Sequence, residues 1–422
     1  MGISGLATYA FFAVSSRSLS ADDYASVGVL WSLMFAVGNG VMQPLEQEVA
    51  RAVSDRRAKG IGPGPVVRRA VQIGAIFSVT LVTLAILTHD FLLDRLLDDD
   101  PALMAAFLIG LVGFAAGHLA RGTLSSHGRF RAYATFFGVD GIARIVFATA
   151  LAVLGVATAG PFGMVLAVTP FLAVGVSVIG RRHMLEDGPA APWVELTRAL
   201  GWLLLGTCSL SLLIQGGTIA VELLATDEQA DAAGVFLNGL QVARIPLFLF
   251  QAVLASLLPK LSHLAGQGRL DEFTHTLRRL LRAILGLGAV ATLAAVVIGP
   301  TVVGIIFGTD TTLGARDLGL LSAASILIMA AISLDQALIA LHRHHVMAVG
   351  WFTTLLVFVG VIALGDDLFL RVEMGLFVGS LWACAWMGYW LQRTRSSYHA
   401  PALDEAHEVD LAEALAEVPM EP

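Results

Sequence analysis

Residues 283–307 read AILGLGAVATLAAVVIGPTVVGIIF and contain no charged side chain. A helix rises about 1.5 Å per residue, so a run of this length can cross the ~30 Å hydrocarbon core of a bilayer. A soluble surface helix needs a polar face, which this stretch lacks. It therefore predicts a membrane-spanning helix.

Apolar blocks recur twelve times along the 422 residues, between charged or Pro- and Gly-containing turns. They lie at about 3–16, 25–45, 70–88, 102–120, 134–156, 159–179, 200–223, 233–257, 283–307, 318–341, 346–365 and 372–391. Only 14% of residues are charged, against about 25% in soluble domains, and the mean hydropathy is +0.77. This composition excludes a soluble enzyme, a disordered chain and a secreted disulfide scaffold. It predicts an all-α polytopic membrane protein of about twelve transmembrane helices.

Basic residues alternate between the loops. The loops after even-numbered blocks, with the tail, hold 20 Lys and Arg, and those after odd-numbered blocks hold four. Because basic loops stay in the cytoplasm, this pattern predicts a multi-pass protein of the cytoplasmic membrane with both termini inside. The first block is only about 24 Å long as a helix, so we expect a short first span or a chain that starts upstream of Met1.

A weak internal repeat suggests two halves. Three features recur at offsets of 209, 210 and 215 residues: Asp22 and Asp231, Arg68-Arg69 and Arg278-Arg279, and His127 and His342. Such repeats are typical of transporters. We expect an N-terminal six-helix lobe at 1–180, a cytoplasmic linker at 181–199, a C-terminal six-helix lobe at 200–392 and an acidic cytoplasmic tail at 393–422, with a central cavity between the lobes.

No motif for covalent chemistry is evident. The two lysines, Lys59 and Lys260, lie outside any G-x-x-x-x-G-K-[ST] loop, and no loop supplies a paired-carboxylate or nucleophile motif. Cys208 and Cys384 lie inside apolar blocks. We therefore expect no enzyme activity, cofactor, metal site or nucleic-acid partner. Residues 270–284 have helical periodicity with a basic side, which predicts either an amphipathic helix on the membrane surface or a helical loop that continues into the ninth span.

Several stretches resemble bacterial polysaccharide-export proteins. They are Asp23-Tyr24 with 44–51 (PLEQEVAR), 243–246 (ARIP) with 258–262 (LPKLS), 271–273 (DEF) with Arg278-Arg279, and 306–308 (IFG) with 315–317 (ARD) and Leu320-Leu321. Together they resemble the multidrug/oligosaccharidyl-lipid/polysaccharide exporter superfamily, in its oligosaccharide-flippase branch. The resemblance covers nearly the whole chain, through pattern and spacing.

This resemblance implies a flippase that moves a polyprenyl-pyrophosphate-linked oligosaccharide across the membrane by alternating access. Twelve spans, instead of the fourteen typical of lipid II flippases, favour a capsular, exopolysaccharide or teichoic-type precursor. Membrane lipids and polysaccharide-synthesis enzymes are the further partners we expect. Two alternatives stay open: a cation-coupled multidrug exporter of the same superfamily, and a non-transporting membrane scaffold of a polysaccharide-synthesis complex.

Candidate site residues are the polar groups at membrane depth, where a charge costs about 2.5–3.5 kcal/mol on insertion scales and so faces a cavity or a partner. For substrate binding they are Arg244, Arg144, Gln241, Asn238, Asn39 and Gln43, and for ion coupling or support they are Asp140, Asp335 and Glu46. Asp140 and Arg144 are spaced to pair along one helix face, either as a structural pair or as a positioned cavity arginine. Glu46 and Glu48 near Arg51 favour an ion pair at the end of the second span.

Arg244 differs from Arg144 because no acidic residue lies within four positions of it. A pyrophosphate brings negative charge into the membrane, and the planar guanidinium binds phosphate oxygens in pairs. With one arginine in each predicted lobe, an anion between the lobes could meet both. We expect Arg244 to be essential for export and Arg144 to contribute less.

Overall fold

The structure, a computed structural model, describes residues 2–180, 184, 186–197, 200–308 and 313–396. Within these ranges the chain is helical and contains no β-strand. The acidic tail predicted at 393–422 lies almost wholly outside the described residues. Six residues of the predicted linker, at 181–183, 185 and 198–199, also lie outside the described residues. The lobe boundaries therefore stay predictions.

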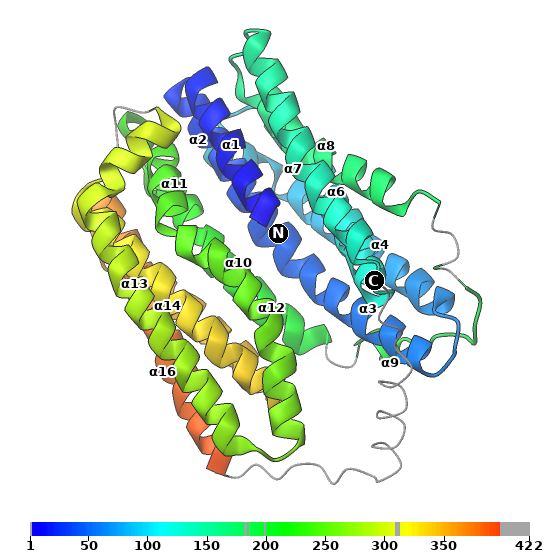
Figure 1. Ribbon diagram of the computed structural model, residues 1–422. Coiled ribbons are helices and arrows are strands. Elements are labelled where there is room, and N and C mark those ends of the chain that lie inside the picture. Colours follow the sequence, from blue (N-terminus) through cyan, green and yellow to red (C-terminus); the bar gives the residue numbers. More distant parts are fainter. Residues whose placement is uncertain (1, 181–183, 185, 198–199, 309–312, 397–422) are drawn as a thin grey trace.

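Most helices follow one another through short turns, and a longer connection joins α8 to α9 (Figure 1). The N-terminal half contains α1 (Gly2–Ser18), α2 (Ala21–Leu33), the π-helix η1 (Met34–Asn39), α3 (Gly40–Ala58), α4 (Gly64–Leu87), α5 (His89–Leu96), α6 (Pro101–Ser126), α7 (Phe130–Val153) and α8 (Ala159–Val178). The C-terminal half contains α9 (Val194–Thr197), α10 (Leu200–Leu224), η3 (Asp227–Gln229), α11 (Ala232–Ala243), α12 (Ile245–Gly266), α13 (Leu270–Phe307), α14 (Ala315–Ala340), α15 (His344–Ile362) and α16 (Leu368–Ser396).

Ten helical segments in the described ranges are long and apolar enough to cross a membrane. The two other predicted spans fall on α1, which has 17 residues, and on α11 with α12, which meet at Arg244. Large apolar side chains face outward along α4 and α13, where Val79 is 66% and Leu287 73% exposed. Water would disfavour such a surface and lipid favours it. The predicted all-α, multi-pass fold in two lobes is confirmed.

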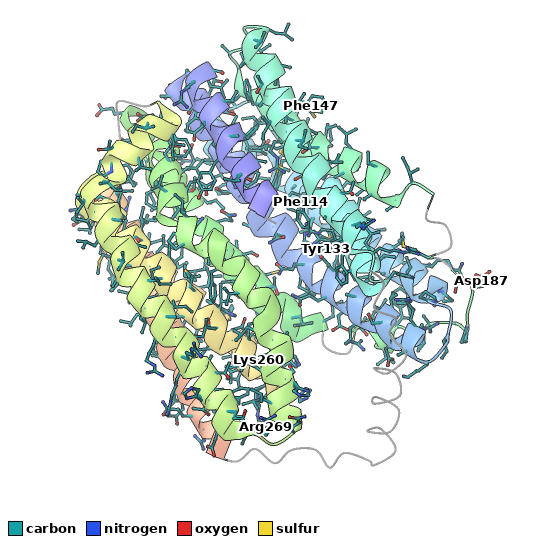
Figure 2. All side chains as sticks on the ribbon, viewed as in Figure 1. Phe114, Tyr133, Phe147, Asp187, Lys260 and Arg269 are labelled. Carbon is teal, nitrogen blue, oxygen red and sulfur yellow. The ribbon has the colours of Figure 1, made fainter. Side chains whose placement is uncertain are left out.

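Figure 1 shows the two lobes as two groups of helices, α1 to α8 and α10 to α16. Their ribbons lie close together near α2 and α11 and diverge toward α3 and α12. Contacts between the lobes come mainly from α10 and α11 against α2, η1 and α3. Figure 2 places Asp187, Lys260 and Arg269, all from predicted cytoplasmic loops, toward the diverging end. We call this the inner end, and the opposite one the outer end.

At the outer end, α1 and α2 are joined to the C-terminal lobe by polar bonds. The Arg17 guanidinium donates to the carbonyls of Ile305 and Ile306, and Ser16 Oγ donates to Phe307 O at 2.7 Å. These groups satisfy carbonyls that the end of α13 would leave free, and a cation is favourable at a helix C-terminus. Gly308 ends α13 with φ +68°.

Close packing continues this contact along α2. A Cβ on Gly28 would lie 2.6 Å from Leu237 Cδ2 of α11, so a larger residue here would require the Leu237 side chain to shift. The Tyr24 hydroxyl bonds the Asn238 side chain on the same face. The lobes are thus closed against each other at the outer end.

The linker binds the N-terminal lobe at the inner end. Arg56, only 6% exposed, donates to both carboxylate oxygens of Glu195 at 2.7 and 2.9 Å and to Pro189 O at 2.7 Å. A bidentate arginine–carboxylate pair is among the stronger side-chain contacts. The described part of the linker is therefore held to α3, not suspended between the lobes.

Two local features refine the expectations. Residues 270–284 continue into the ninth span as one 38-residue helix, α13, which is the second of the two readings of that stretch. The second span contains six residues of π-helix, Met34–Asn39, that no sequence pattern indicated. Single π-turns inside longer helices often lie at functional sites.

Candidate functional site

Two adjoining cavities lie inside the fold. The first, of about 260 Å³, lies within the N-terminal lobe and we call it the lobe cavity. The second, of about 430 Å³, is lined by both lobes and we call it the interlobe cavity. Asn39, Arg121 and Phe137 line both, so the two cavities adjoin, and we call them together the chamber.

The lobe cavity combines aromatic rings with buried charges. Its rings are those of Trp31, Phe35, Phe114, Phe136 and Phe137, and its charged or titratable groups are His118, Arg121, Asp140 and Arg144. Ligand pockets typically have this composition, with apolar walls and a few placed polar groups. In Figure 2, Phe114 and Tyr133 lie within the N-terminal lobe, on its side toward α1 and α3.

Arg144 is the charged centre of the lobe cavity. It donates to Asp140 Oδ2 at 2.6 Å, one turn earlier on α7, as the spacing predicted. Its guanidinium carbon lies 5.1 Å from the centre of the Trp31 ring, within range of a cation–π contact. Arg144 Nε and Asp140 Oδ1 have no hydrogen-bond partner among the described residues. The pair thus retains one donor and one acceptor for a further group.

A second charged cluster joins α3 to α6. Glu46 Oε2 lies 2.7 Å from His118 Nδ1 and accepts a bond from Arg121 at 2.8 Å. The Arg121 guanidinium also lies 5.3 Å from the Phe137 ring centre. The cluster stands where the two cavities meet. The predicted partner of Glu48 is confirmed, since Arg51 donates to it at 2.7 Å, but Glu46 pairs with α6 instead.

The π-helix positions the polar groups of the second span. Asn39, the last residue of η1, donates to Gln43 at 3.3 Å, and both side chains line the interlobe cavity. Trp31 and Phe35, on either side of the η1 boundary, stack with ring centres 4.0 Å apart. The wider π-turn therefore keeps two aromatic rings and an amide on the cavity side of one helix.

The C-terminal lobe contributes Asp335 to the interlobe cavity. The residue as a whole is 5% exposed. Its Oδ2 accepts a bond from Gln336 Nε2 at 3.5 Å, and its Oδ1 has no hydrogen-bond partner among the described residues. An acid in this position can take up a cation or a proton, which agrees with the predicted coupling role without testing it.

Arg244, Asn238 and Gln241 occupy a different place. Arg244 lies between α11 and α12 and donates to Ile214 O of α10. Asn238 bonds Tyr24, and Gln241 O accepts from the Tyr9 hydroxyl at 2.8 Å. None of the three lines the lobe cavity or the interlobe cavity. In this conformation Asn238 and Gln241 belong to the packing between the lobes, while Arg244 bonds a carbonyl of its own lobe.

The two arginines lie near different faces of the first span. Arg144 contacts Thr8 Oγ1 at 3.4 Å, while the hydroxyl of the next residue, Tyr9, reaches Gln241 near Arg244. Consecutive helical residues point about 100° apart, so α1 separates the two. His118 and Arg121, and not Arg244, line the same cavity as Arg144. Their link to Glu46 spans 72 and 75 positions in the chain, and no local spacing could indicate it.

Metal binding finds no support within the described ranges, where no group of three or more His, Cys, Asp or Glu side chains could hold an ion.

Comparison with known proteins identifies the architecture. No family model matches the chain. An uncharacterized protein of Mycobacterium tuberculosis is 24% identical over 363 residues, which cover 83% of this chain and 80% of that protein. A second uncharacterized protein of the same species is 23% identical over 382 residues, covering 88% and 85%.

Solved structures superpose on nearly the whole chain. The inward-facing conformation of a multidrug resistance MATE family transporter of the MOP superfamily superposes with a TM-score of 0.72 at 13% identity, covering 94% of this chain and 96% of that one. The chain has the MATE transporter fold. A MATE transporter of Vibrio cholerae gives 0.66 at 16% identity, with 94% and 95% covered. The outward-facing conformation of the multidrug resistance MATE transporter also gives 0.66, at 14% identity, with 94% and 93% covered.

Proposed function

We propose that the protein is a flippase that moves a polyprenyl-pyrophosphate-linked oligosaccharide from the cytoplasmic to the outer leaflet by alternating access. The observation that carries the proposal is the lobe cavity, where Arg144 and Arg121 lie against aromatic rings. Guanidinium groups bind phosphate oxygens, and flat rings contact the apolar faces of sugars. An anionic saccharide headgroup matches both features.

The conformation agrees with a carrier that awaits substrate from the cytoplasm. The interlobe cavity is lined by both lobes, while the lobes are joined at the outer end. The chain also superposes better on the inward-facing than on the outward-facing MATE structure, 0.72 against 0.66. Rocking of the lobes would then present the chamber to the other side.

This proposal places the substrate's charge near Arg144 and Arg121 and not near Arg244, whose side chain bonds the Ile214 carbonyl of α10 within its own lobe. Arg244 would act on export through lobe packing. The earlier expectation that Arg244 binds the anion stays a separate prediction, which the following experiment distinguishes.

A deletion strain tests the function. Without the protein, lipid-linked saccharide should accumulate on the cytoplasmic leaflet and surface polysaccharide should fall. Complementation with Asp140→Asn/Arg144→Gln, which replaces the cavity charge pair with neutral polar side chains, should fail at wild-type protein levels. Lys260→Gln, which removes an exposed charge outside the chamber, should complement fully.

The outcomes separate the candidates. Full export by the Asp140→Asn/Arg144→Gln variant would overturn the assignment of the chamber. Loss of export in Arg244→Gln, with the chamber variant active, would support the anion site at Arg244.

A cation-coupled multidrug exporter is the second candidate. Its support is the likeness to multidrug MATE transporters and the position of Asp335, which lines the interlobe cavity and whose Oδ1 has no hydrogen-bond partner among the described residues. In that case the deletion strain would show drug hypersensitivity with an unchanged glycan profile. Asp335→Asn would then reproduce the deletion phenotype.

A further inference from the structure

Glu373 is a buried acid outside both cavities. It lies on the second turn of α16, toward the outer end, and none of its surface is exposed. Neither carboxylate oxygen finds a hydrogen-bond partner among the described residues. This distinguishes it from Asp140, Glu46 and Glu48, each of which accepts a bond from an arginine.

The charged groups around Glu373 do not neutralise it. Those that act on it are Arg316 and Asp317 at the start of α14 and Asp367 in the turn before α16. Arg316 already pairs with Asp317 at 2.7 Å, and Asp367 accepts from Leu370 N at 2.8 Å. Because the one nearby arginine is already paired and two acids lie close, the net charge around Glu373 is negative.

An ionised carboxylate that is buried without a partner costs several kcal/mol, and binding a proton removes most of that cost. We propose that Glu373 is a proton-binding site of the C-terminal lobe, reached from the predicted outer side, whose occupancy stabilises the closed contact between the lobes at the outer end.

Packing connects the site to that contact. One turn before Glu373, Phe369 stacks on Phe236 of α11 with ring centres 6.0 Å apart. One turn after it, Leu376 packs against α10, where a Cβ on Gly217 would lie 3.3 Å from Leu376 Cδ1. Phe236 directly precedes Leu237, which meets Gly28 of the N-terminal lobe.

Ionisation of Glu373 requires water to enter between α16 and its neighbours. The movement that admits water would loosen α10 and α11, which are helices of the C-terminal lobe that contact α2. By linkage, a proton held more tightly in the closed state makes closure depend on external pH. For one proton, the ratio of closed to open molecules changes at most tenfold per pH unit.

Cysteine labelling measures this ratio without any transported substrate, so its failure is distinct from failure of the proposed flippase function. Ala25→Cys is a suitable reporter, because Ala25 is buried in the outer contact against Gly234. The background lacks Cys208 and Cys384, and the reagent is a membrane-impermeant maleimide applied to intact cells. Ala157→Cys, at a site exposed in the described structure, corrects for the pH dependence of the thiol reaction.

Corrected labelling at Ala25→Cys should rise with external pH, by up to tenfold per unit. Glu373→Gln should hold labelling low and independent of pH, because the amide is always neutral. Glu373→Asp should keep a pH response with a shifted midpoint, which also covers failure of the Gln variant to fold. Asp366→Asn, which removes a nearby exposed acid, should behave as the parent protein.

Three results would each overturn the proposal. They are pH-independent labelling in the parent, an unchanged pH response in Glu373→Gln, and labelling that follows Na⁺ against choline at constant pH. The last would assign the site to a metal cation.

Discussion

Buried charge is arranged differently in the two lobes. In the N-terminal lobe, Asp140 and Glu46 each bond an arginine within the chamber. In the described part of the C-terminal lobe, Asp335 and Glu373 are buried without a cationic partner. A paired charge keeps its ionisation and fixes a geometry, whereas an unpaired acid changes its charge readily. The comparison suggests that one lobe holds the substrate and the other responds to protons or cations.

The largest expected effect comes from breaking the pair in the N-terminal lobe. Arg144→Ala leaves Asp140 buried and unpaired and should lower the free energy of unfolding by about 3–5 kcal/mol. Thermal unfolding of the purified protein in detergent measures it. The double variant Asp140→Asn/Arg144→Gln should regain most of the loss. A single variant as stable as the parent would show that the pair does not stabilise the lobe.

The outer contact provides the next test. Arg17→Ala removes the guanidinium bonds to the end of α13, a loss of about 1.4 kcal/mol, which corresponds to a tenfold shift toward the outer-open state. Labelling at Ala25→Cys should therefore increase about tenfold. Arg95→Ala, an exposed arginine at the same end of the molecule, is the matched control and should change nothing. Equal labelling in the two variants would mean that Arg17 does not hold the lobes closed.

The comparison of the lobes predicts a smaller effect at Glu373. Glu373→Gln replaces a neutral carboxylic acid by a neutral amide, so the free energy of unfolding at pH 6 should change by less than about 1 kcal/mol. Asp140→Asn, by contrast, leaves Arg144 buried without its anion and should cost several times more. Chemical or thermal unfolding of both variants at one pH measures the two losses in free energy of unfolding. Similar losses would show that Glu373 is ionised and has a partner.

The smallest effect concerns the acidic turn at the outer end. Burial raises the pKa of Asp98, and Asp22 and Asp23 raise it further. The charged form is thus disfavoured in the folded protein, and stability at neutral pH should improve when the charge is removed. Asp98 also has φ +50°, a conformation that asparagine tolerates.

Asp98→Asn should therefore stabilise by about 0.5 kcal/mol at pH 7. The difference should shrink as the pH falls and vanish below about 4, where the carboxyl becomes protonated in both states. A difference that grows on acidification would contradict the raised pKa. Thermal unfolding as a function of pH provides the measurement.

The sequence predicted those site contacts that are local in the chain. Asp140 with Arg144 and Glu48 with Arg51 are three or four positions apart, and helical geometry alone brings such residues together. Polarity at membrane depth also indicated Asn39, Gln43 and Asp335, which all line the interlobe cavity. The η1 π-helix escaped prediction because its stability depends on packing around Trp31 and Phe35 and not on a residue pattern.

Apolar blocks of membrane-spanning length determined the helical, multi-pass fold by themselves, because backbone polar groups in lipid must be satisfied within the helix. Tertiary structure alone decided which polar groups share a cavity. It joined Glu46 to His118 and Arg121, bonded Arg244 to the Ile214 carbonyl of α10, and buried Glu373 without a hydrogen-bond partner among the described residues. These relations depend on how helices distant in the chain rotate and pack against one another, and no spacing along a single helix encodes them.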